Sequence, residues 1–226
     1  MSFGVYVTGT DTGVGKTVAS CALLHALRRH GLRAIGMKPV ASGCSLVDGA
    51  WRNADALALQ QASEPQPRYP DLNPYPLPMP LAPELAARRA GLVLEPATVL
   101  AAHARLQAQA DALVVEGVGG WLAPLSQDWM QAELARALRL PVVMVVGMRL
   151  GCINHALLTA QAVAGDGLHL AGWIASVVDP AMEAIDENLA VLRARLPALC
   201  WGVLPHAPVP DPAAMATRLR LPMLAA

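Results

Sequence analysis

The sequence predicts an α/β fold: a single domain, residues 1–226, built on a parallel sheet with helices on both faces. Three observations support this fold class. Short apolar runs alternate with segments that carry apolar residues at helical spacing. Hydrophobic residues make up 54% of the 226, enough to cover both faces of a sheet. A glycine-rich loop ending in Gly-Lys-Thr separates the first apolar run from the first helical segment, as in a P-loop NTPase-like domain.

The first part of the chain predicts two strands, each followed by a helix. Residues 4–7 are an apolar run with β-forming side chains. Residues 18–27 repeat apolar side chains at helical spacing until His30-Gly31 ends the helix. Residues 34–37 form the second predicted strand, and residues 51–62 form the second predicted helix.

The rest of the chain continues the alternation of helices and strands. The continuous apolar run at residues 112–115 is typical of a strand inside a parallel sheet. Such strands are joined by right-handed crossovers, usually through helices. We expect residues 215–226 to be irregular. The remaining predicted elements are helices at residues 84–109 (one or two), 132–138, 154–164 and 186–195, and strands at residues 142–146, 170–178 and 199–204.

Residues 65–83 interrupt this alternation with eight prolines in nineteen residues. Proline lacks the N–H group that helices and interior strands need, so this density argues against both. We interpret this proline-rich segment as an ordered irregular loop on the substrate side of one domain, because functional loops of this length occur in compact domains. A flexible linker between two domains is the alternative.

Charge and composition exclude several classes of partner. Lys+Arg and Asp+Glu both number 17, and a chain of zero net charge offers no basic field for nucleic acid or a membrane surface. The longest apolar run, residues 140–148, is about half of the ~20 residues that a membrane-spanning helix needs. The four cysteines lack the spacing of a metal or redox pair, and no signal peptide precedes the first strand. We therefore expect a cytoplasmic protein with reduced thiols.

The glycine-rich loop at residues 9–17 predicts a phosphate site. Successive backbone N–H groups of such a turn form a concave anion site, and the next helix directs its positive end at the same place. Lys16 can then reach the β- and γ-phosphates of a nucleotide, and the Thr17 hydroxyl can bind Mg²⁺. The usual pattern has glycine where this chain has Thr10, so a plain solvent-exposed loop is the alternative.

Polar residues follow predicted strands at their carboxyl ends, where ligands bind in parallel sheets. Glu116 closes an apolar strand and is placed to hold Mg²⁺ beside the phosphate loop, with Asp55 as a possible second carboxylate. Lys38 follows another strand, where a second lysine would offset charge on a transferred phosphoryl group. Each residue has a purely structural alternative. Glu116 could be a strand-end acid that hydrogen-bonds a neighbouring loop, and Asp55 an acid at a helix start that the helix dipole favours. Lys38 could be a solvated surface lysine.

The chain carries a series of spaced motifs. These are GTDTxVGKT at residues 9–17, GMKPVASG at 36–43, RNADALAL at 52–59, NPY at 73–75, VEGVGGW at 115–121 and LGCINHA at 150–156, with AGW at 171–173. Together they resemble the dethiobiotin synthetase family. The resemblance runs in order from about residue 3 to residue 206, and its separate blocks make it more specific than the phosphate loop alone.

The resemblance implies an ATP-dependent cyclo-ligase of biotin synthesis. Members of this family close a cyclic urea on 7,8-diaminopelargonate, using CO₂, ATP and Mg²⁺. One amine takes up CO₂ as a carbamate, and the γ-phosphoryl group of ATP passes to the carbamate. The second amine then attacks and expels phosphate. The resemblance also implies a homodimer with substrate sites near the interface between subunits.

The resemblance further implies a role for each matched residue. Lys38, Lys16 and Thr12 would act in catalysis, while Thr17, Asp55 and Glu116 would bind Mg²⁺. Substrate would contact Ser42 and the start of a helix at Gly151, Cys152, Ile153 and Asn154. Nucleotide would contact Gly13, Val14, Gly15, Lys16, Thr17, Val18, Asp55, Glu116, Gly117, Val118, Gly119, Ser176, Val177, Pro205, His206 and Ala207.

Two departures from the family pattern bear on function. The family commonly has an asparagine that reads the adenine amino group where this chain has Ser176, and serine is too short to make the same paired contact. The base specificity of the nucleotide site is therefore open. Position 13, often acidic in the family, is Gly13 here, which eases the turn.

A switch ATPase of the partition or division-site type, with a deviant phosphate loop, is the main alternative function. That class carries a signature lysine five residues before the phosphate lysine, where this chain has Asp11. The chain also lacks the Asn-Lys-x-Asp signature of a GTPase. Its length leaves no room for the glutamine-hydrolysing domain of a corrin-type amide synthase.

Overall fold

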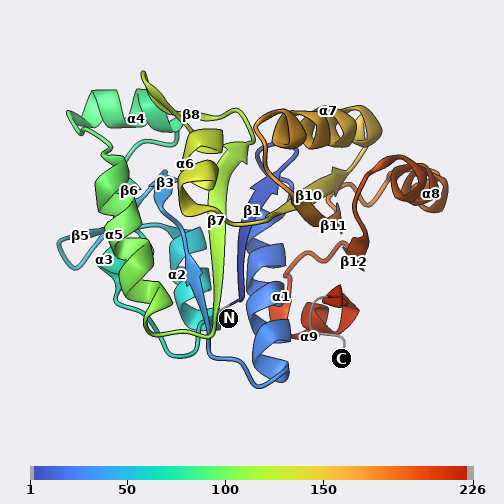
Figure 1. Cartoon of the computed structure of the whole chain (residues 1–226), viewed down its shortest axis with the longest axis horizontal. Coiled ribbons are helices and arrows are strands. Elements are labelled where there is room, and N and C mark those ends of the chain that lie inside the picture. The colour runs from blue at the N-terminus through green and yellow to red at the C-terminus, as the bar shows by residue number, and fades with distance from the viewer. Residues whose placement is uncertain (1–2, 223–226) are drawn as a thin grey trace.

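A computed structural model describes residues 3–222 of the chain. Its centre is a six-stranded sheet in the order β12-β11-β10-β1-β7-β2, and every neighbouring pair in it is parallel (Figure 1). All six predicted strands and their parallel pairing are therefore confirmed. The strands are β1 (Phe3–Gly9), β2 (Ala34–Met37), β7 (Ala112–Gly120), β10 (Val142–Met148), β11 (Leu170–Val177) and β12 (Cys200–Leu204).

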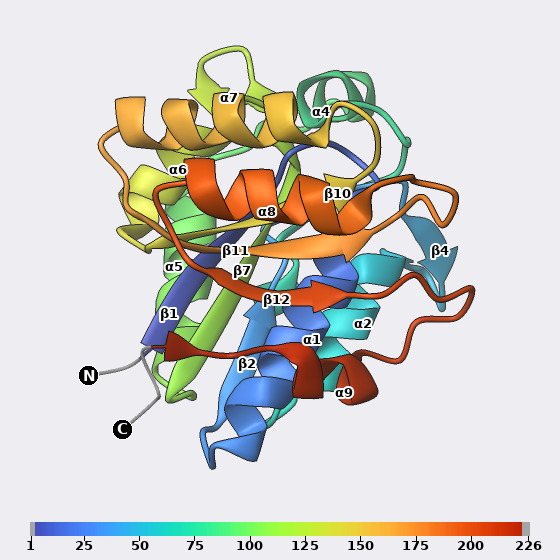
Figure 2. The same cartoon turned by 90° about the vertical axis from the view of Figure 1, so that its right-hand side faces the viewer.

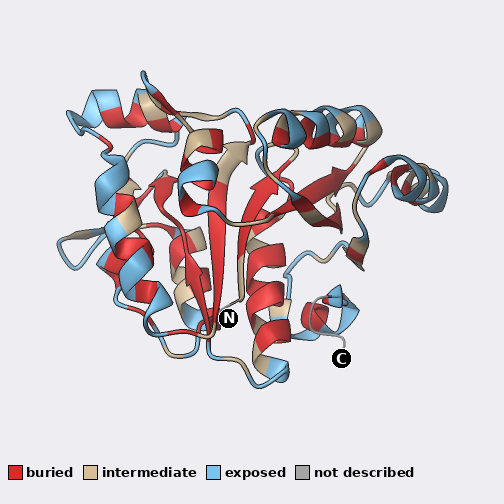
Figure 3. Cartoon of the chain, in the orientation of Figure 1, coloured by how far each residue is buried: buried red, intermediate tan, exposed pale blue. Residues whose placement is uncertain are grey.

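Helices cover both faces of the sheet, as the sequence predicts. Successive side chains of a strand point to opposite faces, so β1 sends Val5 and Val7 into one core and Tyr6 into the other. Figure 2 shows α7 and α8 on one side of β11 and β12, with α1 and α9 on the other. Buried residues run through the whole central sheet (Figure 3). None of the helices in residues 3–222 has the length and hydropathy that crossing a membrane requires.

The helices fall into two layers. On the face that contains Val5 lie α1 (Lys16–Arg29), α2 (Ala54–Ala62) and α9 (Pro212–Met215). On the opposite face lie α5 (Pro96–Gln107), α6 (Gln131–Leu138), α7 (Cys152–Gly165) and α8 (Ile185–Arg195).

The helix predicted at residues 51–62 begins only at Ala54, so that prediction was wrong for its first three residues. Residues 51 and 52 belong instead to β5 (Ala50–Arg52), which pairs antiparallel with β4 (Ser45–Val47). Asn53 has extended backbone angles, and its side-chain oxygen accepts hydrogen bonds from the first free N–H groups of α2. This cap ends the strand and starts the helix.

The proline-rich segment is ordered, but it is not wholly irregular. It contains α3 (Tyr69–Leu72), a single helical turn that the sequence pattern argued against. The turn forms because Pro70 lies at its start, where a missing N–H breaks no helical hydrogen bond. A short strand, β6 (Tyr75–Leu77), pairs in parallel with β3 (Val40–Ser42) in a separate two-stranded sheet, an edge position that proline tolerates.

The prediction of irregular structure at residues 215–226 was wrong for its first part. Helix α9 ends at Met215, and a 3₁₀ turn (Ala216–Arg218) follows. Asp211 starts α9, because its side chain accepts hydrogen bonds from the N–H groups of Ala213 and Ala214. Residues 223–226 lie outside the described residues.

Asp111 and Arg33 hold together the starts of β7 and β2. The Arg33 backbone N–H, Nε and Nη2 donate to the Asp111 carboxylate at 3.0, 3.0 and 2.8 Å. These hydrogen bonds lower the pKa of Asp111 from 3.8 to about 2. An acid whose pKa is lower in the folded protein stabilises the fold above its unfolded pKa. That contribution is lost as pH falls through the folded value.

We expect Asp111→Asn to lower the free energy of unfolding at neutral pH. The difference from wild type should shrink as pH falls from 3.8 toward 2, because a protonated Asp111 no longer pairs with Arg33 as an ion. Urea unfolding of both proteins at neutral pH and at acid pH values within that interval measures the difference. A difference that is equally large at every pH would contradict this account.

Candidate active site

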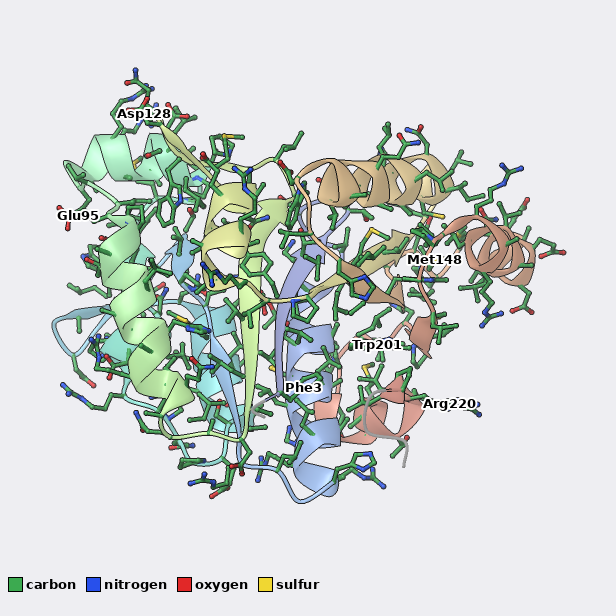
Figure 4. The ribbon with its side chains drawn as sticks, viewed as in Figure 1. Phe3, Glu95, Asp128, Met148, Trp201 and Arg220 are labelled. Carbon is green, nitrogen blue, oxygen red and sulfur yellow. The ribbon has the colours of Figure 1, made fainter. Side chains whose placement is uncertain are left out.

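A cavity of about 900 Å³ lies at the carboxyl ends of β1, β2 and β7. Figure 4 labels Phe3, at the start of β1. The residues that line the cavity lie at the other ends of these strands. Residues 80–83 of the proline-rich segment form one wall. The predicted site residues that line the cavity are Thr12, Gly13, Gly15, Lys16, Thr17, Val18, Lys38, Ser42, Asp55, Glu116, Val118 and Gly119.

The loop after β1 has the conformation that a phosphate site needs. Gly13 and Gly15 have φ angles of 74° and 83°, a region that glycine adopts without strain. A Cβ atom at Gly15 would lie 2.5 Å from Ser176 Oγ, so a larger residue would also clash. Helix α1 begins at Lys16, and Lys16 Nζ donates to the Asp11 carbonyl at 2.9 Å. Within residues 3–222, no side chain caps the start of α1, so the first backbone N–H groups of this helix can bind an anion.

Lys38, Glu116 and Thr17 form a hydrogen-bonded cluster beside this loop. Lys38 Nζ donates to Glu116 Oε1 at 2.5 Å, to the Gly117 carbonyl at 3.2 Å and to Asp55 Oδ2 at 3.4 Å. Thr17 Oγ1 donates to the same Glu116 oxygen at 2.9 Å. Residues separated by up to about a hundred positions in the sequence thus meet at one point, as the strand-end rule predicts.

Lys16 and Lys38 are the only lysines in the sequence, and both are buried at this cavity. Burial, reinforced by the charge of Lys38, lowers the pKa of Lys16 to about 8. Burial also acts to lower the pKa of Lys38, but the Glu116 and Asp55 carboxylates outweigh it and raise that pKa. Lys38 already has its counter-ions, whereas Lys16 is placed to accept an anion from a ligand.

Thr17, Asp55 and Glu116 supply the kind of oxygen atoms that Mg²⁺ prefers. Glu116 is fully buried, and within residues 3–222 its Oε2 atom has no hydrogen-bond partner, which leaves one carboxylate oxygen for a cation. Residues 3–222 contain no group of three or more His, Cys, Asp or Glu side chains that could hold a metal alone. The site therefore fits Mg²⁺ with phosphate oxygens and water completing its coordination.

Several predicted site residues lie outside this cavity. Ser176 packs against Gly15 on the other side of the phosphate loop. Residues 151–154 do open a helix as predicted, because Gly151 adopts a left-handed conformation ahead of α7. The predicted residues that do not line the cavity are Val14, Gly117, Gly151, Cys152, Ile153, Asn154, Ser176, Val177, Pro205, His206 and Ala207.

Sequence reasoning missed two polar residues that shape the site. Gln131 is fully buried, donates to the Gly120 carbonyl at 2.7 Å and accepts from the Val118 N–H at 2.5 Å. Arg149 pairs with the Asp11 carboxylate in the phosphate loop. The Thr12 backbone N–H and Arg149 together lower the pKa of Asp11. Only one sequence signal points to Gln131: it is a polar residue on the apolar side of the helix at 131–138.

Comparisons with known proteins find relatives that match almost the whole chain. A family model described as an AAA domain matches residues 4–214. An ATP-dependent dethiobiotin synthetase BioD of Xanthomonas oryzae pv. oryzae is 62% identical over 217 residues, which cover 96% of this chain and 97% of the relative.

Among solved structures, the fold resembles a signal recognition particle receptor and a cell division protein complex. The signal recognition particle receptor FtsY of Elizabethkingia anophelis in complex with GDP has a TM-score of 0.53 at 15% identity. The match covers 98% of this chain and 60% of that one. The MinC:MinD cell division protein complex of Aquifex aeolicus has a TM-score of 0.55 at 14% identity, covering 92% and 83%. At such low identity these likenesses concern the fold alone.

Proposed function

Because the chain belongs to the dethiobiotin synthetase family, we propose that it uses ATP to close a cyclic urea on 7,8-diaminopelargonate with CO₂, giving dethiobiotin, ADP and phosphate. One observation supports this most strongly: Lys38, Glu116 and Thr17 meet at 2.5 and 2.9 Å beside the phosphate loop, in a cavity large enough for two small molecules. The likeness to MinD does not favour a switch ATPase, because Asp11 stands where that class has its signature lysine.

The phosphate loop would bind the triphosphate of ATP. Backbone N–H groups of residues 13–17 and the start of α1 supply donors for phosphate oxygens. A bound phosphate would give Lys16 a close counter-ion, and so would raise its pKa back toward the ordinary value for lysine. Thr17, Asp55 and Glu116 would hold a Mg²⁺ ion, which supplies positive charge next to the β- and γ-phosphates when bound.

The chemistry needs a carbamate that is made into a good leaving group. One amine attacks CO₂, forms an N–C bond and loses a proton. A carbamate oxygen then attacks the γ-phosphorus as ADP leaves. This step is needed because a free carbamate oxygen is a poor leaving group, whereas phosphate is a good one. The second amine attacks the carbonyl carbon, the C–O bond to phosphate breaks, and the amine loses its proton. Lys38, held between Glu116 and Asp55, would stabilise charge on the oxygens of the transferred group.

The diamine would lie beside Thr12 and Ser42. Residues 80–83 of the proline-rich segment line the same cavity. We expect a symmetric homodimer, in which the start of α7 binds the substrate carboxylate through backbone N–H groups. The start of α7 does not line the cavity of its own chain, and Leu150 beside it is 98% exposed, which fits a site completed at an interface between two copies. All four cysteines are free thiols, in keeping with a cytoplasmic enzyme.

Phosphate release measured with and without the diamine and bicarbonate tests this function. Rapid release should require ATP, Mg²⁺, diamine and bicarbonate together. A monoamine analogue is the matched control, because it can form a carbamate but cannot close the ring to a urea. Phosphate release that is indifferent to the diamine would refute the proposal and favour a switch ATPase.

Ser176 predicts relaxed specificity for the nucleotide base. A serine hydroxyl cannot make the paired amide contact to adenine that the family's asparagine makes. We expect CTP and GTP to support phosphate release at a rate within about tenfold of ATP, the scale of one lost hydrogen bond. The matched variant Ser176→Asn should prefer ATP more strongly. Strict dependence of the wild type on ATP would contradict this expectation.

A further inference from the structure

The proline-rich segment holds the backbone of Lys38 on both sides. The Lys38 N–H donates to the Leu72 carbonyl at 2.8 Å, and Asn73 Nδ2 donates to the Lys38 carbonyl at 2.6 Å. The main sheet cannot satisfy these groups, because β2 ends at Met37 and Pro39 turns the chain away from it. The position of Lys38 is therefore set by residues more than thirty positions later in the sequence.

Tyr69 joins Asn73 to the helix that carries Asp55. The Tyr69 hydroxyl donates to Asn73 Oδ1 at 3.1 Å and accepts from the Asn53 N–H at 2.8 Å. Asn53 Oδ1 accepts from the Asp55 N–H at 3.0 Å, and Asn53 Nδ2 donates to the Ser42 carbonyl at 3.1 Å. A continuous hydrogen-bonded chain thus runs from Lys38 through Asn73, Tyr69 and Asn53 to Asp55.

The residues that form this hydrogen-bonded network are buried. Tyr69, Asn73 and Asn53 are 7%, 1% and 7% exposed. The Tyr69 hydroxyl is used both as donor and as acceptor, and the Arg52 guanidinium lies 4.2 Å from the centre of its ring. A satisfied buried network of this kind permits one arrangement of the groups attached to it.

We propose that Tyr69 and Asn73 are positioning residues, which hold Lys38 and Asp55 at the spacing that phosphoryl transfer requires. The inference rests on the proposed function, in which Lys38 contacts the transferred group and Asp55 contacts the cation. Lys38 Nζ lies only 3.4 Å from Asp55 Oδ2, so a small shift of either backbone alters the distance between them. Misplacement by about 1 Å can cost about a hundredfold in rate.

Tyr69→Phe is the cleanest variant, because it removes the hydroxyl and keeps the buried ring. We expect kcat for diamine-dependent phosphate release to fall about 10- to 100-fold, as for loss of an outer partner of an active group. The dissociation constant of nucleotide without Mg²⁺ should stay near wild type, because the phosphate loop is not part of the hydrogen-bonded network that includes Tyr69. Asn73→Ser, which is too short to reach the Lys38 carbonyl, should behave in the same way.

Tyr75→Phe is the matched control in the same segment. Its hydroxyl accepts from the Glu95 N–H at 2.8 Å, outside the chain that leads to Lys38. Figure 4 labels Glu95 at the far left of the view, in the linker ahead of α5. This variant should keep the kcat of the wild type.

A spectroscopic measurement reports on Lys38 without any turnover. Because the chain has only two lysines, protein labelled with carbon-13 lysine should give two side-chain signals, which Lys16→Met assigns. In Tyr69→Phe and Asn73→Ser the Lys38 signal should shift or broaden, whereas the Lys16 signal should stay in place. Lys16 serves as the internal control for folding.

A wild-type kcat in Tyr69→Phe would overturn the inference. So would a lowered kcat with an unchanged Lys38 signal, because the effect would then not pass through Lys38. An equal loss in Tyr75→Phe would also overturn it, since any loosening of the segment would then suffice. If the wild type shows no diamine-dependent turnover, the proposed function fails, and the Lys38 signal alone decides the inference.

Discussion

Lys38→Ala should lower turnover about a hundredfold or more at saturating ATP, diamine and bicarbonate. The variant removes a fixed positive charge from the place where charge develops on the transferred phosphoryl group. Lys38 is 3% exposed and its pKa is raised by Glu116 and Asp55 against the opposing effect of burial, so it is charged throughout the physiological range. Binding of nucleotide without Mg²⁺ should change little, because Lys16 and the loop N–H groups remain. Near-normal turnover would remove Lys38 from the mechanism.

The same variant should also be less stable, for a separate reason. Glu116 is fully buried, and without Lys38 it loses the ammonium group whose Nζ lies 2.5 Å from Glu116 Oε1. Leaving one member of a buried pair unpaired typically costs about 3–5 kcal/mol. The double variant Lys38→Ala/Glu116→Gln removes the orphaned charge, so urea unfolding should show that stability is partly recovered while turnover is not. Equal stability of the single and double variants would contradict this reading of the pair.

Lys16→Met should lose nucleotide affinity and turnover, each by about a hundredfold or more, yet remain folded. Its stability should equal or exceed that of the wild type. The pKa of Lys16 is lowered to about 8 by burial and by the charge of Lys38, so the folded protein disfavours the charge that this variant removes. We therefore expect Lys16→Met and Lys38→Ala to change stability in opposite directions while they lose a similar amount of activity.

The pH dependence of stability tests this contrast with a definite sign. Between pH 8 and 10.5, unfolded Lys16 keeps a proton that the folded form has lost, so the unfolded state binds more protons. The stability of the wild type should therefore rise relative to Lys16→Met as pH increases through this interval. Cys21 titrates in both proteins and cancels in the difference. A difference that stays constant or falls with pH would contradict the account.

The sequence predicts that several candidate residues meet at one place, because that prediction depends on local pattern. Glu116 and Lys38 each follow an apolar run, and parallel strands bring their carboxyl ends to one edge of a sheet. The phosphate loop is contiguous, so Lys16 and Thr17 are identified from neighbouring residues alone. These residues do meet at one cavity.

The parts that the sequence does not predict depend on contacts between distant residues. Asn73 bonds to Lys38 across thirty-five positions, inside a segment that has no periodic pattern to indicate which side chains face inward. The helix expected at residues 51–62 starts late because the β4–β5 hairpin competes for its first residues, and a helical pattern carries no information about that pairing. Arg149 reaches Asp11 only because β10 and β1 are neighbours in the sheet.

A crystal structure with Mg²⁺, a non-hydrolysable ATP analogue and the diamine tests the central claim most directly: one cavity holds the triphosphate and the substrate together. We expect the γ-phosphate between Lys16 and Lys38, the cation bound by Thr17, Asp55 and Glu116, and the diamine against Ser42 and residues 80–83. Nucleotide and diamine found in separate sites, or the three oxygen side chains turned away from any cation, would contradict the account.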